Sequence, residues 1–201
     1  MNLPNKISIT RICMIPMFVL VFFLDGILPF NYAVAAIIFA LAACTDFIDG
    51  YIARSRGLVT NLGKFLDPIA DKVLVATAMI LLLTMQDTLF SLFGQARAIA
   101  YIAATIFICV ILARELIISA FRQIAAAGGV VMAADKLGKY KTTFQDVAIF
   151  VLIFAVNLPL SVATVFAYIG GVLFTAATVL TVWSGISYVI KNKQVLQDKK
   201  D

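Results

Sequence analysis

Six apolar runs separated by short polar segments dominate the chain. The runs cover residues 12–24, 32–45, 69–85, 98–113, 144–156 and 161–190. A succession of such runs is typical of helices that enter or cross a bilayer, because a membrane-spanning helix needs about 20 predominantly apolar residues. The pattern therefore predicts an all-α integral membrane protein with six transmembrane helices, organised as a single membrane domain over residues 1–201.

The residues before the first run follow a different pattern. Over residues 1–11 apolar side chains alternate with polar ones, and Pro4 stands near the start. This pattern favours a short amphipathic segment that lies at the membrane interface before the first span.

Composition supports the same class of protein. Hydrophobic residues make up 63% of the chain and charged residues 13%, and the mean hydropathy is +1.03. A soluble domain of 201 residues cannot bury that much apolar side chain, so soluble repeats, nucleic-acid-binding modules and disulfide scaffolds are excluded. The cysteines, Cys13, Cys44 and Cys109, are scattered singly and give neither a disulfide framework nor a zinc-binding spacing.

The distribution of basic residues predicts the orientation in the membrane. Six spans place both termini on one side, and fifteen of the sixteen Lys and Arg residues then fall on that side, with Arg97 alone on the other. Basic residues gather in the cytoplasmic segments of membrane proteins. We therefore expect a multi-pass protein of the cell (plasma) membrane with both termini in the cytoplasm and in contact with membrane lipids.

Residues 46–71 contain the strongest candidates for active-site residues. Four of their carboxylates follow a helical spacing, and these are Asp46, Asp49, Asp67 and Asp71. The first two lie three residues apart, and the last two repeat every four residues together with Gly63, so each set shares one face of a helix. Residues 55–61 between the two sets are typical of a turn. The spacing predicts a helical hairpin whose inner faces bring the four acids together.

Four neighbouring carboxylates repel one another unless cations lie between them, so a metal site is the first hypothesis. The chain has no histidine. Oxygen ligands alone favour hard cations such as Mg²⁺, Mn²⁺ or Ca²⁺ over zinc or copper. The alternative is a solvated helix end whose acids pair with nearby basic residues, namely Arg54, Arg56, Lys64 and Lys72.

The spacing D-x2-D-G-x2-A-R-x8-G-x3-D-x3-D resembles the signature of the CDP-alcohol phosphotransferase family at every fixed position. The matching residues are Asp46, Asp49, Gly50, Ala53, Arg54, Gly63, Asp67 and Asp71. The resemblance implies an enzyme that cleaves a cytidine diphosphate-linked donor, transfers its phosphoryl-alcohol part to an acceptor hydroxyl and releases CMP. It also implies Mg²⁺ or Mn²⁺ as cofactor, with two divalent cations expected, and a homodimer.

The same resemblance assigns roles to individual residues. The implied metal ligands are Asp46, Asp49, Asp67 and Asp71, and Asp71 would also act as the general base on the acceptor hydroxyl. The donor, CDP-diacylglycerol, would lie against Gly50, Ala53, Arg54 and Gly63, with Thr10 near its phosphates. A basic residue near a bilayer surface can also extend to the interface, so Arg11 beside Thr10 has that second interpretation.

A second group of charged residues follows the fourth apolar run. It contains Arg114, Arg122, Lys136, Lys139 and Lys141. The two arginines lie eight residues apart, close to one helix face, and arginine favours bidentate contacts with phosphate. The group predicts a pocket for an acceptor that itself carries a phosphate, whereas a collar touching anionic lipid headgroups is the alternative, above all for the lysines.

These segments, together with residues 2–11, resemble the branch of the family that transfers the phosphatidyl group of CDP-diacylglycerol to sn-glycerol 3-phosphate. The products of that reaction are phosphatidylglycerol phosphate and CMP. The other acceptors to consider are serine, inositol, inositol phosphate or a second lipid. A different class, a divalent-cation transporter, would place its acids at the bilayer midplane on broken helices.

Overall fold

The computed structural model describes the backbone of residues 3–56, 61–127 and 136–192 and the side chains of residues 8–45, 66, 68–126 and 138–192. These ranges fold into α1 (Leu3–Phe22), α2 (Asn31–Arg56), α3 (Asn61–Thr84), the 3-10 helix η1 (Phe90–Ala96), α4 (Arg97–Ala127), α5 (Lys136–Ala155) and α6 (Leu160–Lys191). No strand occurs within them. The predicted all-α class, with six α-helices in the described ranges, is confirmed.

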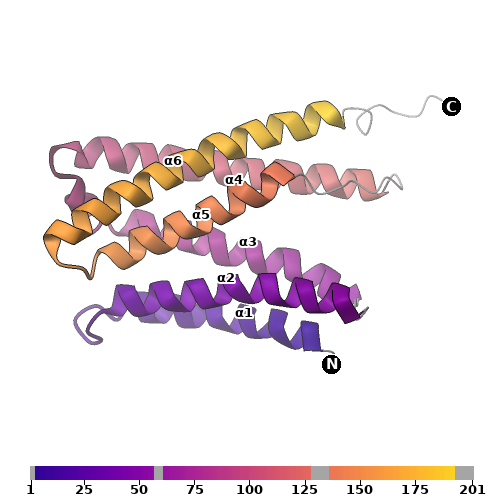
Figure 1. Ribbon diagram of the computed structural model, residues 1–201, viewed down its shortest axis with the longest axis horizontal. Helices are drawn as coiled ribbons and strands as arrows, with labels where there is room; N and C mark the ends of the chain where they lie inside the picture. The colour runs from indigo at the N-terminus through magenta and orange to yellow at the C-terminus, as the bar shows by residue number, and fades with distance from the viewer. Residues whose placement is uncertain (1–2, 57–60, 128–135, 193–201) are drawn as a thin grey trace.

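Both ends of the helix bundle can be followed in Figure 1. The start of α1 and the end of α6 lie at the same end, together with the end of α2, the start of α3, the end of α4 and the start of α5. We call this the termini end, and the opposite one the far end. An even number of passes through the bundle places both chain ends together, as six spans require.

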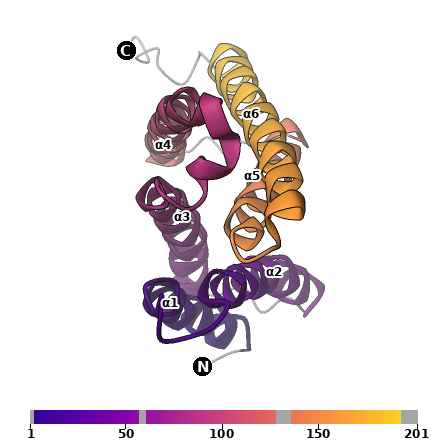
Figure 2. The same ribbon diagram turned by 90° about the vertical axis from the view of Figure 1, so that its left-hand side faces the viewer.

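The helices pack side by side around the long axis of the bundle, which Figure 2 shows from the far end. α1 packs on α2 and α3, and α5 lies between α2 and α6. α4 packs chiefly against α6 and η1 and makes fewer contacts with α3. Residues of α3, α4, α5 and α6 therefore approach one another at the termini end.

The helices are apolar on their outer surface, as a protein embedded in lipid requires. Leu20 of α1, Ile99 of α4 and Val172 of α6 are each about two-thirds exposed or more. In the described part of the chain, two helical stretches are long and apolar enough to cross a bilayer by length and composition, Phe90–Ala126 and Leu160–Lys191. The apolar helices Ser8–Phe22 and Asn31–Thr45 are shorter. These features are those of a membrane protein.

The core is formed by aromatic and aliphatic side chains between the helices. Phe18 of α1 is fully buried, and its ring centroid lies 5.9 Å from that of Phe39 of α2. α5 and α6 approach closely at Gly170, where an added Cβ would lie only 2.7 Å from the side chain of Leu152. At the far end Asn157 accepts a 2.7 Å hydrogen bond from the backbone N–H of Ala33 and so joins the α5–α6 turn to α2.

Several helices extend beyond the apolar runs that predicted them. α1 continues unbroken from Leu3, so the expected interfacial segment and the first span are one helix, and both Ser8 and Arg11 on it are buried. α5 begins at Lys136, so the basic residues expected in a polar connection stand on its first turns. The expected loop after α3 contains η1. Helix ends are set by backbone hydrogen bonding and packing, whereas an apolar run reports only contact with lipid or core.

Candidate active site

The acidic stretch forms two helix ends that meet at the termini end of the bundle. Asp46 and Asp49 stand in the last three turns of α2, and Asp67 and Asp71 in the first three turns of α3. The two helices pack on each other, and the chain leaves α2 at Arg56 and re-enters a helix at Asn61. The hairpin predicted from the spacing is confirmed at the level of the backbone.

Most of the family signature has only its backbone described. The side chains of Asp46, Asp49, Ala53, Arg54, Asp67 and Lys136 lie outside the described part, as do the surroundings of Gly50 and Gly63. Among the side chains that are described, no three from His, Cys, Asp and Glu lie close enough to hold a metal ion. The metal ligands named from the sequence therefore stay a prediction.

Arg11 reaches the acidic stretch from α1. Its side chain is fully buried, and its Nε donates a 3.3 Å hydrogen bond to Oγ1 of Thr45, the residue before Asp46. Thr45 Oγ1 in turn donates to the carbonyl of Ala42 at 2.6 Å. The guanidinium thus lies inside the bundle against α2 and does not extend to the interface, while Thr10 beside it is exposed.

Glu115 joins two of the basic residues that the sequence singled out. Its Oε1 accepts a hydrogen bond from Nζ of Lys141 on α5 and one of 3.2 Å from Nη1 of Arg114 on α4. The Lys141 side chain is 6% exposed and that of Arg114 17%. Two residues separated by 27 positions in the sequence are therefore brought together by one carboxylate.

The same cluster continues to α3. The carboxylate of Asp71 interacts electrostatically with the ammonium group of Lys141. Lys72 donates from Nζ to the hydroxyl of Ser119, which donates to the backbone carbonyl of Glu115. Asp71, the last acid of the signature, is thus within electrostatic reach of the second group of basic residues.

α6 completes the cluster with two polar side chains. Ser184 Oγ accepts a 3.1 Å hydrogen bond from Nη2 of Arg114. Tyr188 accepts a 3.2 Å hydrogen bond at its hydroxyl from Nε of Arg122, whose guanidinium carbon also lies 5.2 Å from the centroid of the tyrosine ring. We call Lys72, Arg114, Arg122 and Lys141, with Asp71 and Glu115, the charged cluster.

Not every predicted phosphate-binding residue joins this cluster in the same way. Arg114 and Lys141 share Glu115, whereas Arg122 lies two turns further along α4 and is exposed. Lys139 is also exposed, because two residues along a helix point to different sides. Ser184 and Tyr188 were not predicted. Two polar residues four positions apart on an otherwise apolar helix share one face, and this pattern could have indicated a polar contact.

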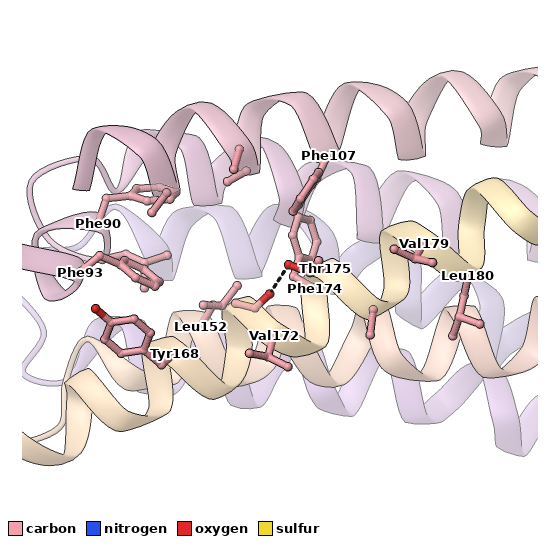
Figure 3. Close-up of a pocket in the computed structure, with 16 residues that line it drawn as sticks. Phe90, Phe93, Phe107, Leu152, Tyr168, Val172, Phe174, Thr175, Val179 and Leu180 are labelled. Atoms are coloured by element: carbon pink, nitrogen blue, oxygen red, sulfur yellow. Dashed lines mark hydrogen bonds between the residues drawn. The ribbon is translucent and has the colours of Figure 1, made fainter. Parts of the chain in front are cut away.

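A large cavity lies in another part of the molecule. It has a volume of about 760 Å³ and lies between η1, α4 and α6, lined by Phe90, Phe93, Phe107, Tyr168, Phe174 and other, mostly apolar residues (Figure 3). The hydroxyl of Thr175 in its wall donates to the carbonyl of Gly171 at 2.8 Å. None of the predicted site residues lines this cavity. A second cavity of about 490 Å³ between α4 and α6 is apolar except for Arg114.

Comparison with known proteins agrees with these features. The family model described as CDP-alcohol phosphatidyltransferase matches residues 1–183. A relative from Bacillus subtilis (strain 168), named CDP-diacylglycerol–glycerol-3-phosphate 3-phosphatidyltransferase, is 36% identical over 98% of this chain and 97% of its own length. Relatives with the same name from Escherichia coli (strain K12) and Salmonella typhimurium are 38% identical, each over 98% of both chains. The chain therefore belongs to the CDP-alcohol phosphatidyltransferase family.

Proposed function

We propose that this chain is a membrane enzyme that transfers the phosphatidyl group of CDP-diacylglycerol to sn-glycerol 3-phosphate and releases CMP. The observation that carries the proposal is the position of Arg114 and Lys141, two basic side chains held together by Glu115 within electrostatic reach of Asp71. A phosphorylated acceptor needs cationic groups next to the carboxylate that receives its hydroxyl proton. The names of the relatives from Bacillus subtilis and Escherichia coli give the same pair of substrates.

The acidic hairpin would hold the donor and its metal ions. Asp46, Asp49, Asp67 and Asp71 supply only carboxylate oxygens, and such a set suits two Mg²⁺ or Mn²⁺ ions. Bound divalent cations neutralise the negative charge that gathers when phosphorus is attacked. The remaining positions carried over from the family signature, Gly50, Ala53, Arg54 and Gly63, would lie against CDP-diacylglycerol, with Thr10 at the edge of the same site.

The charged cluster would bind the acceptor. Arginine has five N–H donors and lysine three, so Arg114 and Lys141 can hold Glu115 and a phosphate at the same time. Arg122 would contact the phosphate from the outer side of the pocket, while Lys139 and Lys136 would draw the anion toward it. Held in this way, the glycerol hydroxyl faces Asp71, which accepts its proton. The acceptor oxygen then bonds to the phosphorus that carries diacylglycerol, and the bond from that phosphorus to the oxygen of CMP breaks.

Charge supports one orientation in the membrane. The basic residues of the described helices gather at the termini end, and Arg97, which pairs with Asp87, stands at the start of α4 at the far end (Figure 1). By the preference of basic residues for the cytoplasm, we infer six spans with both termini and the active site on the cytoplasmic face of the plasma membrane. A homodimer is proposed from the family resemblance alone.

The position of the acidic residues also favours an enzyme over a cation transporter. A cation pathway needs its carboxylates near the middle of the bilayer. Here the acidic residues occupy the final turns of α2 and the first turns of α3. This placement supports an active site at the membrane surface, where a water-soluble acceptor can enter.

A panel of radiolabelled acceptors tests the proposal. The purified protein is supplied with CDP-diacylglycerol in mixed micelles and Mg²⁺, and then with glycerol 3-phosphate, serine, inositol or inositol phosphate, while CMP release and the lipid product are measured. We expect product with glycerol 3-phosphate and turnover at least about 100-fold lower with serine and inositol, because an acceptor without a phosphate cannot make the charge-assisted hydrogen bonds that Arg114 and Lys141 are placed to donate. Equal turnover with serine or inositol would refute the assignment of the acceptor.

A further inference from the structure

α6 contacts both arginines of the charged cluster, although it carries no residue of the acidic signature. Ser184 and Tyr188 accept hydrogen bonds from Arg114 and Arg122, and Gly185 lies against the stem of Arg114. We propose that these three residues of α6 are positioning residues that fix the two guanidinium groups for the phosphate of the acceptor. The inference rests on the proposed function, because it assigns the phosphate to this cluster.

The hydroxyl of Ser184 has a defined direction. Its residue is buried, and its Oγ donates a 3.2 Å hydrogen bond to the carbonyl of Thr181 one turn earlier on α6. The proton is therefore turned toward the helix, and a lone pair is directed at Nη2 of Arg114. Glu115 holds Nη1 of the same guanidinium at 3.2 Å. Two fixed acceptors leave one N–H on each terminal nitrogen for a ligand.

Gly185 is required by the path of the Arg114 side chain. A Cβ at this position would lie 3.0 Å from Cγ and 3.3 Å from Nε of Arg114. Contacts that short are uncommon between packed atoms, so the stem of Arg114 would have to shift by a few tenths of an ångström, and its guanidinium would shift with it. The backbone of α6 at Gly185, where there is no side chain, thus packs directly against the side chain of Arg114.

Tyr188 holds Arg122 by a different combination of contacts. The tyrosine is buried, and its ring packs edge-on against Phe121 with centroids 6.2 Å apart. Arg122 is exposed, so without a partner its long side chain would sample many rotamers. The hydrogen bond to the hydroxyl and the stacking on the ring restrict it to one side of α4.

An oriented pair of arginines lowers the entropy lost when the acceptor binds. The contacts involve only the proposed acceptor pocket and leave the acidic hairpin untouched. A defect in α6 is therefore expected to weaken binding of glycerol 3-phosphate and to leave the use of CDP-diacylglycerol unchanged.

The test compares Gly185→Ala and Ser184→Ala with matched controls on the same helix. Gly170→Ala adds the same methyl group against Leu152, and Thr178→Val removes a buried hydroxyl that bonds only to its own helix, at the carbonyl of Phe174. We expect the KM for glycerol 3-phosphate to rise about tenfold in each α6 test variant, because Ser184→Ala loses a hydrogen bond to a charged group and Gly185→Ala displaces the same guanidinium. The KM for CDP-diacylglycerol should change less than about twofold, and both controls should keep the KM ratio of the wild type.

A double variant distinguishes positioning from general damage to the fold. If Gly185 acts through Arg114, then Gly185→Ala should add nothing to the KM for glycerol 3-phosphate once Arg114→Ala is present. An unchanged KM in the single variants, equal rises for both substrates, or an effect that persists beside Arg114→Ala would each overturn the inference. Failure of the wild type to use glycerol 3-phosphate would instead overturn the proposed function.

Discussion

The carboxylate of Glu115 is the point at which the charged cluster can be broken with the smallest change. Glu115→Gln keeps the shape of the side chain and removes its charge. Lys141 and Arg114, 6% and 17% exposed, would then face each other without the anion that they share. We expect this variant to be destabilised, because two neighbouring cations with little access to water have lost their counter-charge.

The size of the effect follows from burial. Removing one partner of a fully buried ion pair costs about 3–5 kcal/mol, whereas an exposed pair contributes about 0–1 kcal/mol. The Glu115 side chain is 24% exposed. The expected cost therefore lies between these limits, at about 2–3 kcal/mol. For a chain of this length each kcal/mol lowers Tm by about 2–4 °C, so Glu115→Gln should lower it by about 4–12 °C.

Thermal unfolding in detergent, followed by the helical circular dichroism signal, measures this cost. Asp87→Asn is the matched control, because its carboxylate pairs with Arg97 at the far end and is 90% exposed. It should change Tm by no more than about 2–4 °C. Combining Glu115→Gln with Lys141→Met should restore part of the lost stability, with a coupling energy of about 1–2 kcal/mol. Strictly additive effects, or equal shifts for Glu115→Gln and Asp87→Asn, would refute the shared ion pair.

Two further predictions concern catalysis. Asp71→Asn should lower kcat by about 10²–10⁴-fold, which is the usual contribution of a general base. CDP-diacylglycerol should still bind to this variant in an equilibrium assay. An equal loss of donor binding would contradict the role of Asp71 as the base. Activity should disappear on addition of EDTA and return with an excess of Mg²⁺ or Mn²⁺, and turnover that continues without a divalent cation would contradict the carboxylate metal site.

The acidic hairpin could be predicted from sequence because its signals are local. The aspartates repeat at helical spacing, and the residues between them favour a turn, so α2 ends at Arg56 and α3 begins at Asn61 as expected. The continuation of α4 past Arg114 and Arg122 was also predicted, whereas the start of α5 at Lys136 could not be predicted in the same way. α5 continues as a helix through its basic residues at the termini end, and the low hydropathy of these turns gives no helix signal.

The contacts between helices were the part that sequence could not supply. The sequence predicts a phosphate pocket from Arg114 and Lys141, but it does not indicate that the carboxylate of Glu115 joins them. The partners of α6, Ser184 and Tyr188, are 70 and 66 positions away from the arginines that they contact. Such pairs depend on how each helix is rotated and packed, and apolar periodicity fixes that rotation only roughly.

The charged cluster also explains why a phosphorylated acceptor suits this site better than a neutral one. Four basic side chains face two carboxylates, Asp71 and Glu115, which leaves a formal excess of two positive charges. A phosphate monoester carries about two negative charges near neutral pH and would balance that excess. Serine or inositol would leave it unbalanced around Arg114 and Lys141, the two basic side chains with little exposure. If charge alone governed binding, Glu115→Gln would lower the KM for glycerol 3-phosphate, because it removes a negative charge. We expect the KM to rise instead, because the same change releases Arg114 and Lys141 from the geometry in which they meet the phosphate.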